Sequence, residues 1–569
     1  MHGPVLYFPN LEGNWIINPS TIMESRRSFL KKSALTGLGA SMISAQAASM
    51  DGPDPGKATL IITADLHAQL FTHDEFFWER DTAVFRKRGG LAVLKTLISR
   101  LRRKYPENIL IDAGDYFHGH AIATLTEGQA LVPLMNDFNY DLLVPGNWEV
   151  VYRKSGMLRD LGAIGAEKVC ANMFHKGEQG DKGELIFRPW IIREIAGARI
   201  GIIGYTDHLT PRRQPPAFSN GIAFEHPNAS LARHIRHLKE VEGCGIIVVV
   251  THIGLAQQVA LANHPSCAGA DLVIGADTHE RVREPIRCTH ARVVECGAFG
   301  SFVGRLTMDI TDGRMGEIDY ELIDADPEQF PPDRAMERSV RAAALPFREQ
   351  LGQVLGHTTT PLMRYFVLET PMDNLITDAI RWKYQPDIAL SNGFRFCQPL
   401  AIPSSGKAAI TREYLYNMLP LDSITREAWV TGRQLNEWLE KELENAFAPD
   451  PAKRFGGWFV RFSGMEVSFT IGNPAGKRVN SILIGKQPMD PDREYRVVAC
   501  EREGDPADTL CRIEKVLRPL TLDKTTHQVM EEYLAVHSPV SPRLEGRAVA
   551  TDQPATLLTQ LQGTTYQFR

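Results

Sequence analysis

Five β-rich segments of this chain are each followed directly by a turn that carries Asp, His or Asn. The segments cover residues 59–63, 108–111, 142–144, 245–250 and 272–274, and their turns contribute Asp65, His67, Asp115, Asn147, His252, Asp277 and His279. Because the carboxyl ends of parallel strands meet at one edge of a sheet, these turns are expected to lie together. Packing alone would favour apolar residues there. The pattern predicts a layered α/β sheet with a polar cluster along one edge.

Strands and helices alternate along the first half of the chain, which predicts an α/β domain over residues 58–324. An acidic, Pro-rich segment and a helical pattern follow, and we predict a linker with a bridging helix over residues 325–355. A second, α+β domain is predicted over residues 356–549, with helices at 374–383 and 432–446, before a tail at 550–569. A chain of 569 residues is too long for one core, which agrees with two large domains.

The N-terminus carries an export pattern. Arg26 and Arg27 precede a weakly apolar, small-residue stretch, and Ala45 and Ala47 form a small-x-small cleavage pattern. These features predict a twin-arginine signal peptide over residues 1–47, with export of the folded protein to the periplasm by the twin-arginine translocase. Met23 offers a later start that would leave residues 1–22 untranslated. The apolar stretch is too short for a membrane anchor.

Charge and cysteine usage exclude some classes of protein. A formal net charge of −5 provides no broad basic surface for wrapping nucleic acid. The eight cysteines form no C-x-x-C pair, which argues against a zinc ribbon or a thioredoxin-like motif. One or two disulfides remain open, with Cys288 and Cys296 the nearest pair along the chain.

The five turns resemble the motifs of the calcineurin-like metallophosphoesterases, and within them those of the 5′-nucleotidase family: D-x-H, G-D, G-N-H-E, H and G-H-x-H. The resemblance implies a four-layer αββα sandwich followed by a 5′-nucleotidase-type C-terminal substrate domain. It also implies that one metal is held by Asp65, His67, Asp115 and His279, and the other by Asp115, Asn147, His252 and Asp277. Asp115 would then bridge the two metals.

The donor set suits two divalent cations. Two such ions about 3.5–4 Å apart need a bridging carboxylate to offset their repulsion, and together they convert a bridging water into a hydroxide nucleophile. Imidazole, carboxylate and amide ligands favour manganese, zinc or iron over a thiolate-selective metal. The resemblance implies manganese.

Two positions depart from the family pattern. Asp277 stands where the family has His, which keeps an oxygen ligand but adds a negative charge and weakens that metal as a Lewis acid. Trp148 replaces the His that assists the leaving group, and an indole has no proton to give at neutral pH. General acid catalysis contributes about 10²–10⁴-fold, so its loss favours a substrate with a stable leaving group. His118 and His120 are alternative proton donors.

Trp148 resembles the SoxB thiosulfohydrolase branch of the family. Several segments of the second domain, including residues 372–374 and 388–395, match that branch in the same order along the sequence. The resemblance implies that sulfate is released from a cysteine S-thiosulfonate on a SoxYZ-type carrier protein, by attack of the metal-bridging hydroxide. The persulfide that leaves is stable without a proton. Asn392, Phe396 and Cys397 depart from the pattern of that branch.

Substrate contacts are predicted in the second domain. Arg395 follows a turn from which its guanidinium could bind a tetrahedral oxyanion, with an exposed salt bridge as the alternative. Gly456 and Gly457 could let backbone N–H groups approach an anion, or form an ordinary turn. Phe455 and Trp458 flank them, where a nucleotidase would stack a base. The predicted substrate-binding residues are Asn392, Arg395, Phe455, Gly456, Gly457 and Trp458.

Two other functions remain open at this level. A 5′-nucleotidase or broad phosphomonoesterase of nucleotide catabolism would act on a small-molecule phosphoester. A non-catalytic metal-binding homologue would keep the fold with a degraded site, a reading motivated by Trp148 and Asp277.

Overall fold

A computed structural model describes residues 56–80, 82–177, 180–392 and 396–555, and in these ranges the first half of the chain forms two six-stranded sheets. One sheet has the order β17 (Arg314–Asp324), β16 (Phe302–Thr311), β1 (Lys57–Thr63), β4 (Asn108–Asp112), β5 (Leu142–Leu143) and β6 (Glu167–Lys168). The other has the order β14 (Ile286–Arg287), β15 (Arg292–Glu295), β13 (Leu272–Gly275), β12 (Ile246–Thr251), β10 (Ala198–Tyr205) and β9 (Trp190–Ile195). Strands β1, β4, β5 and β6 are parallel, as are β10, β12, β13 and β15. Each strand predicted from the sequence in this half is present.

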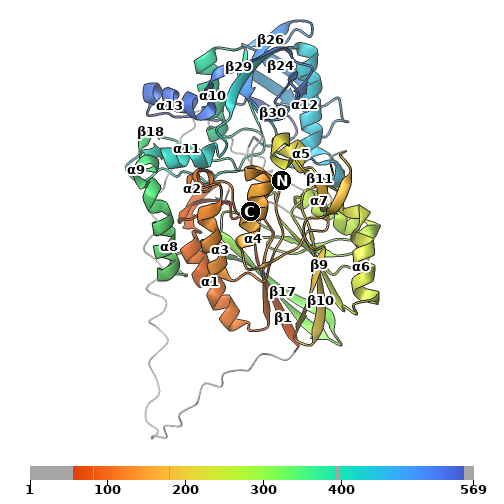
Figure 1. The fold of residues 1–569 in the computed structure, drawn as a ribbon. Coiled ribbons are helices and arrows are strands. Elements are labelled where there is room, and N and C mark those ends of the chain that lie inside the picture. The colour runs from red at the N-terminus through yellow and green to blue at the C-terminus, as the bar shows by residue number, and fades with distance from the viewer. Residues whose placement is uncertain (1–55, 81, 178–179, 393–395, 556–569) are drawn as a thin grey trace, which may run out of the picture. The chain divides into compact units, whose positions relative to one another are not determined.

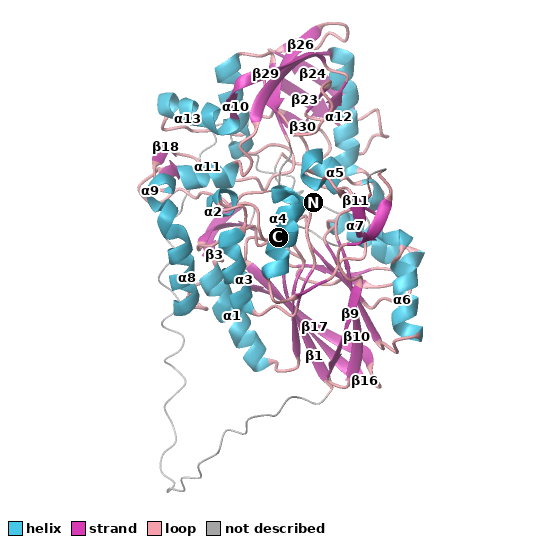
Figure 2. Ribbon diagram, in the orientation of Figure 1, coloured by secondary structure: helices cyan, strands magenta, loops and turns pink. Residues whose placement is uncertain are grey.

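Strand residues alternate between an inner and an outer core, because successive side chains of a strand point to opposite faces. Leu60 of β1 packs with Val248 of β12 between the two sheets. Ile61 packs on the other face of β1 with residues of α1 (Leu91–Lys104) and α3 (Val132–Phe138). The outer face of the second sheet is covered by α6 (Leu231–Glu240) and α7 (Leu255–Asn263), so the helices lie on both sides of the sheets (Figure 2). The predicted four-layer αββα sandwich is confirmed.

The predicted bridging helix is present as two α-helices joined by a 3₁₀ turn. Helix α8 (Arg334–Ala344) starts at Asp333, whose side chain accepts hydrogen bonds from the first-turn N–H groups. Pro346 then lies in a 3₁₀ turn, and only the short helix α9 (Arg348–Leu351) follows before β18 (Val354–Thr358). The helical run predicted from residue 334 to about 355 is present over residues 334–351, with a 3₁₀ turn at Pro346, which lacks the N–H that would continue the α-helical ladder.

The second half of the chain forms a five-stranded sheet with the order β22 (Arg461–Ser463), β19 (Ile388–Ser391), β26 (Glu494–Cys500), β21 (Ile424–Thr431) and β29 (Leu517–Thr525). A four-stranded sheet has the order β25 (Gln487–Pro488), β24 (Val479–Ile484), β23 (Met465–Phe469) and β30 (Ala548–Ala550). The two helices predicted here are α10 (Pro371–Tyr384) and α12 (Gly432–Phe447), and the second starts with a Thr431–Gln434 capping box (Figure 1). Helices α11 (Arg412–Met418) and α13 (Thr526–His537) complete this half.

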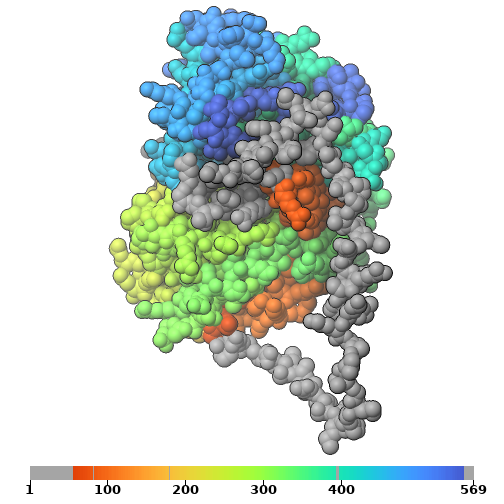
Figure 3. Space-filling model, turned by 180° about the vertical axis from the view of Figure 1, so that it is seen from behind, coloured from red at the N-terminus to blue at the C-terminus, as the bar shows by residue number. Residues whose placement is uncertain are grey.

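Contacts between the two halves bring residues of both to one site. Tyr365 donates a hydrogen bond to Glu75 Oε1 at 2.6 Å, and Arg502 Nη2 donates to the carbonyl oxygen of Arg212 at 3.0 Å. In the space-filling view the blue and cyan residues of the second half lie above the yellow and green residues of the sandwich (Figure 3).

The structure bears on the predicted disulfide but does not describe the predicted signal peptide. The signal peptide predicted over residues 1–47 lies outside the described residues. None of the helices in the described part of the chain has both the length and the apolar character that a membrane span needs. All eight cysteines lie within the described ranges and are free, so Cys288 and Cys296 do not form a disulfide.

Candidate metal centre

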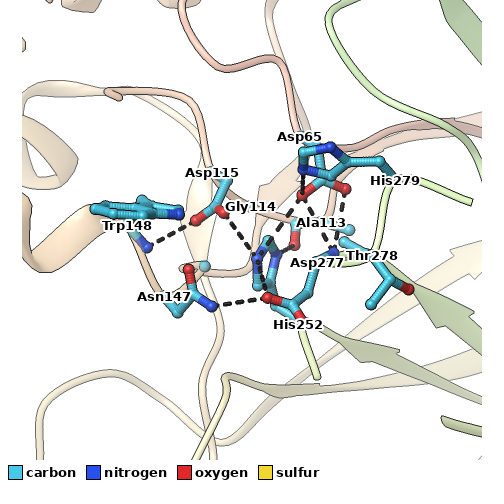
Figure 4. A network of polar contacts seen from close by, with 12 residues as sticks. Asp65, Ala113, Gly114, Asp115, Asn147, Trp148, His252, Asp277, Thr278 and His279 are labelled. Carbon is cyan, nitrogen blue, oxygen red and sulfur yellow. Dashed lines mark hydrogen bonds and ion pairs between the residues drawn. The ribbon is translucent and has the colours of Figure 1, made fainter. Parts of the chain in front are cut away.

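The seven predicted metal ligands converge beyond the carboxyl ends of β1, β4, β5, β12 and β13. Figure 4 labels six of them, all except His67. Among the described residues, two groups of three have ligand atoms within 4.8 Å of one another: Asp65, His67 and His279, and Asp65, Asp115 and His252. Asn147 and Asp277 lie beside the second group. The structure therefore brings together every ligand position that the sequence predicted.

The turns that carry these side chains have unusual backbone conformations. Five ligand residues have positive φ angles, namely Asp65 (50°), His67 (45°), Asp115 (65°), Asp277 (89°) and His279 (59°). Such angles are uncommon for residues with a side chain and cost on the order of 1–3 kcal/mol each. Hydrogen bonds between the turns hold them, because Asp65 N donates to Gly114 O at 2.9 Å and His67 N to Asp115 O at 2.8 Å. Strain of this kind clusters at functional sites.

Two buried glutamates fix the turns, and neither was assigned a role from the sequence. Glu149 Oε2 accepts hydrogen bonds from Asp115 N at 3.0 Å and Gly146 N at 2.5 Å. Glu295 Oε1 accepts from Thr278 Oγ1 at 2.9 Å, within the turn between β13 and β14. A Cβ on Gly146 would lie 2.2 Å from Asp115 Oδ1, so only glycine fits. The place of Glu149 in the G-N-x-E motif was the signal that could have identified it.

The histidines of the first ligand group present lone pairs to a common point. His67 Nδ1 lies 3.3 Å from the carbonyl oxygen of His118, which can only accept, so Nδ1 carries the proton. Burial lowers the pKa of His67 to about 4, which keeps the ring neutral. Its Nε2 atom lies 3.0 Å from His279 Nε2 and 3.8 Å from Asp115 Oδ2. Ligand atoms gathered in this way fit a cation between them.

The second ligand group also directs an imidazole nitrogen into the site, and it carries more negative charge than the first group. His252 Nδ1 lies 2.7 Å from the carbonyl oxygen of Ala113, so its Nε2 faces the site. This Nε2 lies 3.1 Å from Asp115 Oδ2, 3.8 Å from Asp65 Oδ1 and 4.0 Å from Asp277 Oδ1. Burial alone would lower the pKa of His252, but the surrounding carboxylates outweigh it and raise the pKa well above its ordinary value. The carboxylates therefore require a positive charge here, which a divalent metal would supply.

Two carboxylates reach both ligand groups. Asp115 Oδ2 lies between His67 and His252, and its Oδ1 accepts a hydrogen bond from Trp148 N at 2.8 Å. Asp65 Oδ1 lies 3.6 Å from His279 Nε2 and 3.8 Å from His252 Nε2. The bridging role of Asp115 stays a prediction, with Asp65 as its structural competitor.

Asp277 is paired with Arg213, a residue that no sequence pattern indicated. Arg213, at the end of α5 (Thr210–Arg213), donates from Nη1 to Asp277 Oδ2 at 2.6 Å. The same Nη1 lies 3.2 Å from Asp207 Oδ2. The negative charge that Asp277 adds to the site is therefore balanced by a guanidinium. Charge balance of this kind was invisible in the sequence, because Arg213 lies 64 residues away in the chain.

Asn147 can present its oxygen to the same place. Its Nδ2 donates to Asp277 Oδ1 at 2.7 Å, and its Oδ1 accepts from Gln214 Nε2 at 3.1 Å. Gln214 Oε1 is buried and has no hydrogen-bond partner in the described structure. Rotating both carboxamides by a half turn would pair Asn147 Nδ2 with Gln214 Oε1 and bring Asn147 Oδ1 beside Asp277 Oδ1. The donor set then fits divalent cations on both sides.

The predicted proton donors are poorly placed for that role. Trp148 stacks on His118 with ring centroids 3.7 Å apart and planes at 6°. His118 is 1% exposed, does not line the pocket, and burial lowers its pKa well below the ordinary value. His120 caps α2 (Ala121–Leu125) and lies 2.9 Å from Glu413 Oε1. The roles suggested for His118 and His120 as replacement acids therefore find no support in this geometry.

A pocket beside the ligands is lined by residues of both halves of the chain. The predicted residues that line it are Trp148, Asn392, Phe455, Gly456, Gly457 and Trp458. Arg395 lies outside the described residues. Arg213, Glu442 and Arg512 also line the pocket and were not predicted. Phe396, a departure from the SoxB pattern, lines it too and packs against His67 at 4.8 Å between ring centroids.

The fold and the donor set define a metal-dependent hydrolase. Two family models match the chain, the calcineurin-like phosphoesterase model at residues 58–281 and the 5′-nucleotidase C-terminal domain model at residues 354–501. The chain belongs to the 5′-nucleotidase family of calcineurin-like metallophosphoesterases.

Relatives and solved structures cover both functions considered from the sequence. The trifunctional nucleotide phosphoesterase YfkN of Bacillus subtilis is 26% identical over 91% of this chain, which spans only 37% of that protein's length. A 5′-nucleotidase of Vibrio cholerae is 22% identical, covering 85% of this chain and 91% of its own. The sulfate thiohydrolase SoxB of Thermus thermophilus has a TM-score of 0.78 at 21% identity, covering 90% of this chain and 99% of its own. A 5′-nucleotidase precursor of the same organism has a TM-score of 0.75 at 24% identity, covering 88% and 100%. These two structures agree with the fold.

Proposed function

We propose that this protein is a periplasmic, SoxB-like thiosulfohydrolase that releases sulfate from a cysteine S-thiosulfonate on a SoxYZ-type carrier. In this reaction a water oxygen attacks the sulfonate sulfur and the S–S bond breaks. The electron pair leaves with the carrier's persulfide, and sulfate and two protons are released. Divalent metals at the site, with manganese our expectation, would supply a nucleophile at neutral pH and Lewis acidity.

The proposal depends most on the proton donors of the pocket. Apart from the metal-type ligands, the described residues that line it offer no free acid. Trp148 stands at the position of the family's acid, and Glu442 accepts two hydrogen bonds from Arg512 at 2.9 and 2.6 Å. An alkoxide leaving group needs a proton, whereas a persulfide does not. The site therefore favours the sulfur substrate.

The residues of this chain position the reaction in two ways. The backbone N–H of Trp148 orients the Asp115 carboxylate, while the indole stacked on His118 keeps that imidazole out of the pocket lining. The ring of Phe396 packs edge-on against His67. Trp148 and Phe396 therefore give the pocket an apolar wall beside the ligands.

One observation favours a 5′-nucleotidase as the second candidate. Phe455 is partly exposed in the pocket, where a nucleobase could stack on it. Its ring is, however, already within 5.3 Å of the Arg212 guanidinium and 5.4 Å of that of Arg213. Trp458 is 6% exposed and packs in the core of the second half, so a two-sided stack is not preformed.

The test is a parallel assay of two products. Metal-loaded protein is incubated with a thiosulfonated SoxYZ-type carrier and, separately, with AMP, and sulfate and phosphate release are measured. We expect sulfate release from the carrier and slow release of phosphate from AMP. Rapid turnover of AMP without action on the carrier would reverse the assignment in favour of the nucleotidase. An Asp115→Asn variant is the control for metal-dependent turnover.

A further inference from the structure

We propose that Arg213 binds the anionic group of the substrate, and that Asp277 and Asp207 hold its guanidinium in place for this contact. The inference rests on the proposed function for the identity of the anion, a sulfonate. The contact itself would serve any tetrahedral oxyanion, because planar N–H pairs of arginine match such oxygens.

The hydrogen-bonding state of Arg213 is the first argument. Its side chain is 10% exposed, and Nη1 is directed at the carboxylates of Asp277 and Asp207. Nε and Nη2 are buried and have no hydrogen-bond partner among the described residues. An unsatisfied buried donor costs about 1–3 kcal/mol, and more when the group is charged. Because Arg213 lines the pocket, an acceptor that enters the pocket would meet these donors once the guanidinium turns towards it.

Gly456 supplies the second argument. A Cβ at this position would lie 2.8 Å from Arg213 Nη2 and 3.0 Å from its Cζ, and the φ angle of Gly456 is +91°. The absence of a side chain therefore leaves room for the guanidinium against the backbone. The sequence suggested that Gly456 lets backbone N–H groups approach an anion. The structure indicates that Gly456 instead makes room for Arg213, whose guanidinium would bind the anion.

The other cations near the pocket are less suited to an anion. Arg512 makes two hydrogen bonds to Glu442, so its guanidinium is already engaged. Arg212 is exposed, lies over the Phe455 ring at 5.3 Å and does not line the pocket. Asp277 also makes a cation necessary here, since its charge would repel an anionic substrate unless it is balanced.

The experiment measures anion binding by metal-loaded protein, with inorganic phosphate and sulfate as probes in calorimetry. Arg213→Met removes the charge at similar length, and Arg212→Met is the matched control on the neighbouring residue. We expect Arg213→Met to weaken the affinity for both probes by roughly 10- to 100-fold, and Arg212→Met to change it less than about twofold. Metal content by mass spectrometry accompanies each measurement.

Unchanged probe affinity in Arg213→Met with its metals retained would overturn the inference and leave Arg213 as a partner of Asp277 only. If Arg213→Met loses metal, the comparison becomes Asp277→His against the double variant Asp277→His/Arg213→Met, in which position 277 no longer carries a carboxylate that needs the arginine. Equal affinities of those two proteins also overturn it. Failure of the thiosulfohydrolase assignment gives a different result, namely intact, Arg213-dependent anion binding without sulfate release from the carrier.

Discussion

The two sides of the metal centre are built differently. The first side has two imidazoles, His67 and His279, and aromatic rings surround it, with Phe299 centred 5.9 and 5.2 Å from them. The second side has one imidazole, His252, with the amide of Asn147 and the carboxylate of Asp277. Polar and charged groups surround the second side, among them Arg213 and Gln214.

This difference indicates that the first side holds its metal firmly, whereas the second side sets the metal preference and the contact with substrate. A nitrogen-rich site with apolar walls holds its ion in a fixed environment, where little can be adjusted without losing the fold. The oxygen-rich side can vary in charge, and a change there alters both the preferred metal and the contact with an anionic substrate. The departures from the family pattern lie at Asp277 on the second side and at Trp148 beside it.

Removing a carboxylate that joins the two sides should have the largest effect. We expect Asp115→Ala to lose both metals and all measurable turnover, a loss beyond the roughly 10–100-fold typical of outer-shell partners. Asp65→Ala is the matched comparison and should retain one metal. Metal stoichiometry by mass spectrometry decides between them. Two metals in Asp115→Ala and none in Asp65→Ala would make Asp65 the bridge.

A smaller effect is expected from moving Asp115 without removing it. In Gly146→Ala the new methyl group would meet Asp115 Oδ1 at 2.2 Å, so the carboxylate must shift. A displacement near 1 Å can cost about 10²-fold in rate. Gly162→Ala, which meets no atom within 4 Å, is the control and should retain full activity. Steady-state rates of the two variants would be compared, and equal rates would contradict the packing described at Gly146.

Changing the second side alone should alter which metal it prefers more than how many metals the protein binds. We expect Asp277→His to keep two metals and to shift activity towards zinc over manganese by about 10-fold, because imidazole suits zinc better than a carboxylate does. Activity titrations with each metal measure this ratio. Loss of a metal in this variant would show that the pair with Arg213 holds position 277 in a geometry in which histidine cannot bind the metal.

The smallest effect on activity is expected at Glu75, which pairs with Arg281 and accepts a hydrogen bond from Tyr365 of the second half of the chain. Burial alone would raise the pKa of Glu75, but Arg281 at 2.6 Å, with hydrogen bonds from neighbouring side chains, outweighs it and holds the pKa at about 2. A depressed pKa contributes stability that is present above about pH 4.5 and is lost as the pH falls towards 2.

Glu75→Gln tests this contribution, which is on the order of 3 kcal/mol. The variant should unfold more easily than the parent at neutral pH, and its stability should fall less between pH 4.5 and 2. Chemical unfolding at several pH values measures both. Parallel stability curves for the two proteins would show that Glu75 contributes nothing to the acid response.

The sequence predicted the sandwich and the positions of the ligands because both depend on local patterns. Apolar runs define the strands, and the turn after each strand is at most a few residues away, as Asp65 and His67 are from β1. Parallel pairing then brings those turns to one edge, whatever lies between them in the chain.

The rest depends on contacts between distant segments. Arg213 reaches Asp277 from the short helix α5, which carries no recognisable motif, and the stacking of His118 on Trp148 joins two separate turns. The pairing of His120, a predicted proton donor, with Glu413 of the second half is another contact between distant segments that no local pattern indicates. Pro346 places a 3₁₀ turn between α8 and α9 within the predicted helical run, a local effect that the helical pattern alone does not indicate.

The most direct test of the account concerns the leaving group. The rates of metal-loaded protein would be measured on phosphate monoesters that differ in leaving-group pKa, from nitrophenyl phosphate to AMP, for the parent chain and for Trp148→His. The account predicts a steep fall in kcat/KM towards AMP in the parent, and a gain on AMP of about 10²–10⁴-fold in Trp148→His with little change on nitrophenyl phosphate. A parent chain that hydrolyses AMP as readily as nitrophenyl phosphate would contradict it.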